Sequence, residues 1–156
     1  NLGKEYEKYG TVNYIVEHHT QVVGRLIKEG KIKVQMGENG KVTYHDPCNL
    51  SRMLDIVDEP RTAIRSASSD FQEMEESGRN TLCCGAGGAL WWKKETQGRT
   101  HLVRAEQVIE SGADTVVTGC NFCYGMMKQG LGPMTPEGRE EVTVKDVADI
   151  VADNLV

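Results

Sequence analysis

Apolar residues recur with helical spacing in some stretches of the chain and gather into short runs in others. From Thr20 they return at helical intervals and stop at Gly30, and the same spacing leads from Leu102 to Gly112. A glycine just after the last periodic residue is typical of a helix end. Residues 31–36 and 41–45 flank a turn-rich tetrapeptide, which predicts a hairpin or a strand pair.

The remaining pattern continues this alternation of strands and helices. We expect short strands at residues 12–16, 71–74, 81–82 and 115–118, helices after Cys48 and from Pro60, and a Gly/Pro loop over 130–138. A closing helix is expected to bury Val144, Val147, Ile150, Val151 and Leu155. Strands alternating with helices predict an α/β fold with a mostly parallel sheet flanked by helices.

Chain length indicates the number of domains, and the charge and the apolar runs argue against some classes of partner. The 156 residues are enough for one core, so we expect a single domain over residues 12–156, preceded by a charged junction, 1–11, from an upstream domain. There are 18 Lys and Arg against 23 Asp and Glu, a net charge of −5 with no basic block, which argues against a nucleic-acid partner. No run of eighteen apolar residues exists, so we expect no direct membrane insertion.

The five cysteines carry the candidate chemistry. Their odd number and low density do not fit a secreted disulfide scaffold and favour a reducing, cytoplasmic compartment. Each follows an expected strand, and loops at the carboxyl ends of parallel strands meet at one edge of a sheet. We therefore expect the sulfurs to converge, and convergent thiolates bind zinc or an iron–sulfur cluster. The residues are Cys48, Cys83, Cys84, Cys120 and Cys123.

A glycine loop directly follows the cysteine pair. Gly85, Gly87 and Gly88 allow close approach of backbone N–H groups, which would stabilise anionic sulfur, as would helices beginning after Cys48 and Cys123. Three other interpretations stay open at this point. The cysteines could be small core residues, Cys120 and Cys123 could form a dithiol redox motif, or four cysteines could bind a structural zinc ion.

Other side chains near the cysteines are weaker candidates. His45 could supply a proton to a departing thiolate, or could hold the Asp46-Pro47 turn. Arg52 lies one turn after Cys48 and could offset cluster charge or form a surface ion pair. His18 and His19 are expected to cap a helix or to lie on the surface. Of Trp91 and Trp92, we expect one to cover the cluster and the other to pack against the core.

The cysteine spacing resembles that of a known family. Thirty-four residues separate Cys48 from Cys83, 35 separate Cys84 from Cys120, and two more precede Cys123. The flanking sequences 44–52 (YHDPCNLSR), 83–88 (CCGAGG) and 112–114 (GAD) also match. Together they resemble the cysteine-rich CCG domain of heterodisulfide reductase catalytic subunits and their relatives, over about residues 12–155.

The resemblance implies a function for the whole set of cysteines. In this family the five cysteines bind a non-cubane 4Fe–4S cluster, which receives electrons from ferredoxin-type clusters and cleaves or forms a disulfide. It implies an oxidoreductase subunit whose domain is not active alone, with redox partner subunits, a membrane quinone-reactive subunit among them, and a cytoplasmic place at the inner face of the membrane. The alternatives are an iron–sulfur subunit of glycolate or lactate oxidation and a zinc-binding or metal-free structural module.

Some positions depart from the family pattern. Many relatives have His at Asn49, Gly at Ser51 and Ala89, and Pro at Asn121. None of these departures removes a cysteine, but they border the cysteines and leave the substrate open. The sequence around residues 118–127 favours the heterodisulfide-reductase-like subunit of the membrane complex that serves dissimilatory sulfite reduction.

Overall fold

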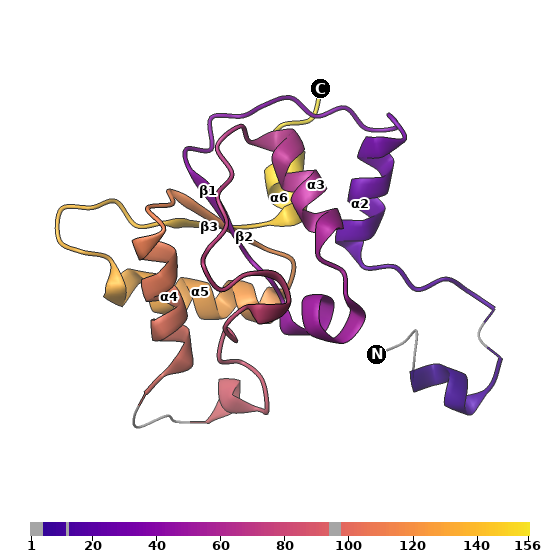
Figure 1. Ribbon diagram of the computed structural model, residues 1–156, viewed down its shortest axis with the longest axis horizontal. Coiled ribbons are helices and arrows are strands. Elements are labelled where there is room, and N and C mark those ends of the chain that lie inside the picture. The colour runs from indigo at the N-terminus through magenta and orange to yellow at the C-terminus, as the bar shows by residue number, and fades with distance from the viewer. Residues whose placement is uncertain (1–4, 12, 94–97) are drawn as a thin grey trace.

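A parallel sheet lies between two layers of helices (Figure 1). The computed structural model describes residues 5–11, 13–93 and 98–156. In the order in which they lie side by side, the strands are β1 (Val42–His45), β2 (Thr115–Thr118) and β3 (Thr143–Asp146). Both pairs of neighbours are parallel, which confirms the predicted α/β class.

The helices divide between the two faces of the sheet. They are α2 (His19–Lys28), α3 (Asp58–Ala67), α4 (Thr100–Glu110), α5 (Asn121–Met134) and α6 (Val147–Ala152). Figure 1 shows α2, α3 and α6 on one face and α4 and α5 on the other. The described residues also include short 3₁₀ helices, η1 (Tyr6–Tyr9), η3 (Gly78–Asn80) and η4 (Leu90–Trp92), and one turn of π-helix, η2 (Asn49–Met53).

The pairing of the strands brings their carboxyl ends to one edge. The backbone of Lys41 accepts a bond from Asp114 N–H and donates to the Asp114 carboxylate at 2.8 Å, which fixes the start of β1 beside β2. The register then places His45 opposite Thr118, and Thr118 opposite Asp146. The residues after all three strands therefore emerge together, as expected for a parallel sheet.

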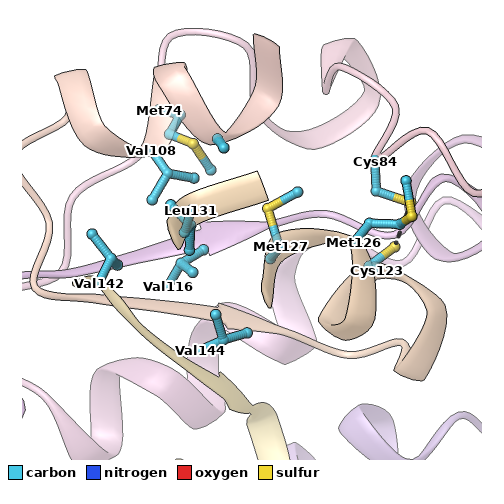
Figure 2. Close-up of a cluster of buried hydrophobic side chains, with 11 residues drawn as sticks. Met74, Cys84, Val108, Val116, Cys123, Met126, Met127, Leu131, Val142 and Val144 are labelled. Carbon is cyan, nitrogen blue, oxygen red and sulfur yellow. Dashed lines mark hydrogen bonds between the residues drawn. The ribbon is translucent and has the colours of Figure 1, made fainter. Parts of the chain in front are cut away.

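Two apolar clusters fill the layers. On one face, Val42 and Val117 pack with Ile64 of α3 and Ile150 of α6, all fully buried. On the other face, the buried residues of the strands and of α4 and α5 form the second cluster, and Figure 2 shows Cys84 and Cys123 at one end of it. The core of the sheet thus continues directly into the cysteine region.

The expected hairpin over residues 31–45 is wrong. Residues 31–36 pair with the end of the chain instead: Val34 and Leu155 form an isolated antiparallel bridge, and Val156 N–H donates to Lys33 C=O at 3.1 Å. A Cβ at Gly37 would lie 1.9 Å from the Asn154 side chain, so the glycine permits this close crossing. β1 is left to pair with β2.

Two boundaries near the carboxyl end also differ from the prediction. Val144 belongs to strand β3 and not to the closing helix, because residues 143–146 pair with β2 before Asp146 caps α6 through Ala148 N–H at 2.8 Å. The expected loop over 130–138 begins only after Met134, since α5 continues to bury Gly130 and Leu131 against α4.

Three short strands predicted from composition are absent from the described residues. Residues 13–16 form no strand, with Tyr14 and Ile15 exposed, and position 12 lies outside the described residues. Phe71 makes only an isolated bridge to Val42. Residues 81–82 have no strand partner, and side-chain donors of Arg52 and Arg104 bond the two oxygens of Thr81. In the described part of the chain, every helix is too short or too polar to cross a membrane.

The α4–α5 contact provides a stability test. A Cβ at Gly130 would lie 2.9 Å from His101 C=O and 3.0 Å from Ala105 Cβ. Gly130→Ala should therefore lower the free energy of unfolding by about 1–3 kcal/mol, although alanine favours helix. Denaturant unfolding would measure this. The control Gln129→Ala, exposed on the same helix, should change stability little; an unchanged or raised midpoint for Gly130→Ala would contradict the packing.

Candidate metal centre

The end of β1 sends two neighbouring polar side chains to opposite faces of the sheet. His45 and Asp46 are both buried, at 1% exposure. Asp46 accepts two bonds from the Arg61 guanidinium on α3, at 2.8 and 2.9 Å, and a third from Gly78 N–H at 2.7 Å. The Asp46-Pro47 turn is therefore held by Asp46 and Arg61, and the alternative that His45 holds it is wrong.

His45 instead faces α4, where Arg104 is fully buried. Arg104 Nε donates to His45 Nδ1 at 3.0 Å, and its terminal nitrogens donate to Thr81 Oγ1 at 3.1 Å and Glu76 C=O at 3.0 Å. Arg104 was not among the residues predicted from the sequence. The sequence could have indicated its burial, because Arg104 falls between His101 and Val108 on the face of an amphipathic helix that is buried.

Cys48 begins the turn that follows β1. The N–H groups of Leu50 and Ser51 both donate to Pro47 C=O at 2.9 Å, which closes a single turn, η2, in place of the expected helix. Arg52 donates to Arg79 C=O at 2.9 Å and to Thr81 C=O. Its guanidinium thus anchors the backbone that leads to the cysteine pair, which differs from both roles expected for it.

The glycine loop shapes the surroundings of Cys83 and Cys84. Gly85 N–H donates to Cys83 Sγ at 3.4 Å. Gly85 has φ +89°, and a Cβ there would lie 3.1 Å from His101 N, so both conformation and space require glycine. A Cβ on Gly87 would lie 4.0 Å from Cys83 Sγ, whereas Gly88, at φ +62°, faces open space.

Cys120 and Cys123 lie at the beginning of α5. Cys120 is the residue before the helix, and Cys123 is in its first turn, so the helix starts earlier than expected. Backbone N–H groups of Phe122 and Cys123 approach the Cys120 sulfur. A helix N-terminus favours thiolate over thiol.

The structure brings the cysteines together at the carboxyl edge of the sheet. Cys123 Sγ and Cys84 Sγ are 3.4 Å apart (Figure 2). Cys48 is within electrostatic reach of Cys83, Cys84 and Cys120. All five are free thiols, two buried and three half-buried. A cavity of about 450 Å³ opens beside them, with Cys48, Cys120 and Cys123 in its lining.

The remaining wall of this cavity comes from α2 and β3. His18 caps α2, as expected, and accepts the Thr20 N–H at 3.4 Å, while His19 Nε2 lies 3.0 Å from the Asp146 carboxylate. All three of His18, His19 and Asp146 line the cavity, which was not predicted from the sequence. The signal was weak, because a histidine pair before a helix is commonly a cap.

The aromatic residues after the glycine loop have separate places. Trp91 packs against the α4–α5 cluster, whereas Trp92 is exposed. Both rings meet Phe122 edge-on, at 5.8 and 6.1 Å. Phe122 lies between Cys120 and Cys123, so this aromatic group borders the cysteine edge.

Proximity makes the thiols unequal. Hydrogen bonds from Cys123 and then from His45 lower the pKa of Cys84 to about 4, against the effect of burial. A hydrogen bond from Cys123 likewise lowers the pKa of Cys120 to about 6. The same bonds, together with burial, raise the pKa of Cys123. Burial and the neighbouring sulfurs raise the pKa of Cys48.

These donors fit a soft metal centre. Five thiols without a disulfide suit a sulfur-ligated cluster, and backbone N–H groups point at Cys83 and at Cys120, which stands at the start of α5. A smaller set is also close: the donor atoms of His45, Cys84 and Cys123 lie within 4.8 Å of one another, which is the arrangement of a partial zinc site. The geometry thus offers two candidate metal sites.

Comparison with protein families identifies the family to which the chain belongs. The model of the family described as "CCG: Cysteine-rich domain" matches residues 42–128, more than half of the chain. The chain belongs to this CCG family. The match covers all five cysteines, the glycine loop and both of the strands that present them, β1 and β2.

Curated relatives extend the similarity over nearly the whole chain. The probable iron-sulfur-binding oxidoreductase FadF of Bacillus subtilis is 33% identical over 100% of this chain, and the EtfAB:quinone oxidoreductase of Syntrophomonas wolfei is 33% identical over 96%. A subunit of the dihydromethanophenazine:CoB--CoM heterodisulfide reductase of Methanosarcina barkeri is 30% identical over 99%. The CCG chain spans only 22% of the first two relatives and 36% of the third.

The unequal thiols of this CCG chain predict unequal reactivity. In the metal-free protein at pH 7, Cys120 should be alkylated by iodoacetamide at least about tenfold faster than Cys48, because the thiolate is the nucleophile and both are half-buried. Raising the pH to 9 should accelerate Cys48 and leave Cys120 nearly unchanged. Mass spectrometry of quenched peptides would measure both rates; equal rates at pH 7 would contradict the arrangement.

Proposed function

We propose that this chain is the cluster-binding domain of a heterodisulfide-reductase-like iron–sulfur oxidoreductase. Its five cysteines would hold a non-cubane 4Fe–4S cluster, and the substrate would be a thiol or a disulfide. The observation that carries the proposal is the gathering of five free thiols from three segments of the chain at one sheet edge, beside an open cavity. Membership of the CCG family and the names of the relatives support it.

The chain's own residues would hold and shield the reacting sulfur. An iron–sulfur cluster would supply one-electron steps and a soft binding site for sulfur. Reduction of a disulfide to two thiols takes two electrons and two protons, so electrons must come from a redox partner. The cavity of about 450 Å³ suits a small ligand, and His18, His19 and Asp146 provide its polar wall.

The partners follow from the same proposal. Ferredoxin-type iron–sulfur domains would deliver electrons, and a quinone-reactive membrane subunit would connect the domain to the inner face of the membrane. The name of the Syntrophomonas wolfei relative, an EtfAB:quinone oxidoreductase, supports a link to quinone chemistry. In that arrangement residues 12–156 form the CCG domain, residues 1–11 join it to an upstream domain, and catalysis requires the complex.

A zinc-binding structural module is the second candidate. The proximity of His45, Cys84 and Cys123 favours it, because a histidine and two cysteines are common zinc ligands. It would leave Cys48 and Cys83 without a role as ligands. Metal content distinguishes the two candidates directly.

Anaerobic loading with iron and sulfide tests the proposed function. The protein should become brown and hold about four irons per chain. Cys84→Ser should lose most of this iron, because the Cys84 sulfur lies 3.4 Å from Cys123 Sγ and interacts with Cys48. Elemental analysis and visible absorption would measure the loading.

Thr43→Val is a matched control for this loss. Thr43 is fully buried on β1, ahead of the strand's carboxyl end, and should retain iron. Colourless wild-type protein that contains zinc after anaerobic purification would overturn the cluster proposal in favour of the structural module. Retention of all iron by Cys84→Ser would remove Cys84 from the ligand set.

A further inference from the structure

We propose that Arg104 fixes His45 as a hydrogen-bond donor to Cys84, so that His45 tunes the metal centre without binding the metal. The pair would act as positioning residues: Arg104 holds the imidazole, and the imidazole holds the sulfur. The consequence for the cluster rests on the proposed function, whereas the state of the imidazole does not.

The guanidinium of Arg104 is held on all sides. Besides His45, its nitrogens donate to Glu76 C=O at 3.0 Å, Gln107 Oε1 at 2.6 Å and Thr81 Oγ1 at 3.1 Å. The residue is fully buried, so water cannot replace these partners. A planar guanidinium bonded at every nitrogen has little freedom to turn away from the imidazole.

The donor determines the tautomer of His45. Arginine offers only N–H groups and has no acceptor, so His45 Nδ1, at 3.0 Å from Arg104 Nε, must accept with its lone pair. A ring nitrogen that accepts a hydrogen bond carries no proton, so the bond from Arg104 leaves the imidazole neutral. A neutral imidazole carries one proton, which therefore lies on Nε2.

This tautomer decides what His45 offers to the cysteines. The nitrogen left for Cys84 carries a hydrogen, and the imidazole and the Cys84 sulfur are close, with the ligand atoms of His45, Cys84 and Cys123 all within 4.8 Å of one another, so the ring can donate to that sulfur. A protonated ring nitrogen has no lone pair for a metal, so in this tautomer His45 would not join Cys84 and Cys123 as a ligand of the second candidate, a zinc ion. Hydrogen bonds to ligand sulfur stabilise the more reduced, more negative state of a cluster and raise its reduction potential.

Two substitutions at His45 separate its two nitrogens. In His45→Asn the amide oxygen replaces Nδ1, so the bond from Arg104 remains and the donor to Cys84 is lost. In His45→Gln the amide nitrogen replaces Nε2, so the donor remains. In the anaerobically loaded protein, a redox titration followed by electron paramagnetic resonance should give a more negative midpoint for His45→Asn and a midpoint near wild type for His45→Gln.

The iron content of the two His45 variants should be measured in the same experiment. Both His45 variants should keep the iron of the wild type, since the imidazole is not a ligand. Loss of iron from both would overturn the proposal, and so would equal midpoints for the Asn and Gln variants.

The tautomer itself can be measured without any metal. In the metal-free wild-type protein, ¹⁵N nuclear magnetic resonance of the histidine rings should show His45 neutral with its proton on Nε2. Arg104→Met should abolish this fixed state, whereas Arg61→Lys, at a buried arginine that bonds Asp46, should preserve it. A proton on Nδ1 in the wild type would overturn the proposal. If the wild type takes up no iron, the proposed function fails and this measurement still decides the role of Arg104.

Discussion

The parallel pairing of β1 with β2 is the constraint on which the candidate centre depends. Because His45 is in register with Thr118, the chain that leaves β1 toward Cys48 and the chain that leaves β2 toward Cys120 start side by side. A register shift of one residue would turn each side chain of β1 to the opposite face of the sheet, so His45 would point away from Arg104 and Asp46 away from Arg61. The sulfurs can therefore meet only in this register.

Two buried arginines brace that strand end from opposite layers. Arg61 on α3 binds Asp46, and Arg104 on α4 binds His45, so each helix layer holds one of two consecutive residues. Arg104 also reaches Thr81, which ties the irregular segment before Cys83 to the same point. Side-chain donors thus position the segment before Cys83, which has no strand pairing. They bring Cys83 and Cys84 beside Cys48 and Cys120, which follow β1 and β2.

The sequence predicted the parts of this arrangement that depend on local pattern or on cysteine spacing. The α/β class, the helix capped by His18, strand β2 and the glycine at position 85 follow from periodicity, capping and close approach. The pairing of residues 33–37 with the carboxyl end and the continuation of α5 through Gly130 depend on contacts between distant segments. Local composition carries no information about such contacts, and it predicted a hairpin and a loop.

The same limit explains why Arg104 was missed while His45 was noticed. His45 is next to the cysteine motif in sequence, but its chemistry is set by a residue 59 positions away. Proximity in sequence suggested a proton donor for a departing thiolate. The bond from Arg104 argues for a fixed donor instead, because an imidazole that gave up its Nε2 proton would become an anion in a buried site. The fold therefore favours His45 as a stable electrostatic partner of the sulfur over His45 as an acid.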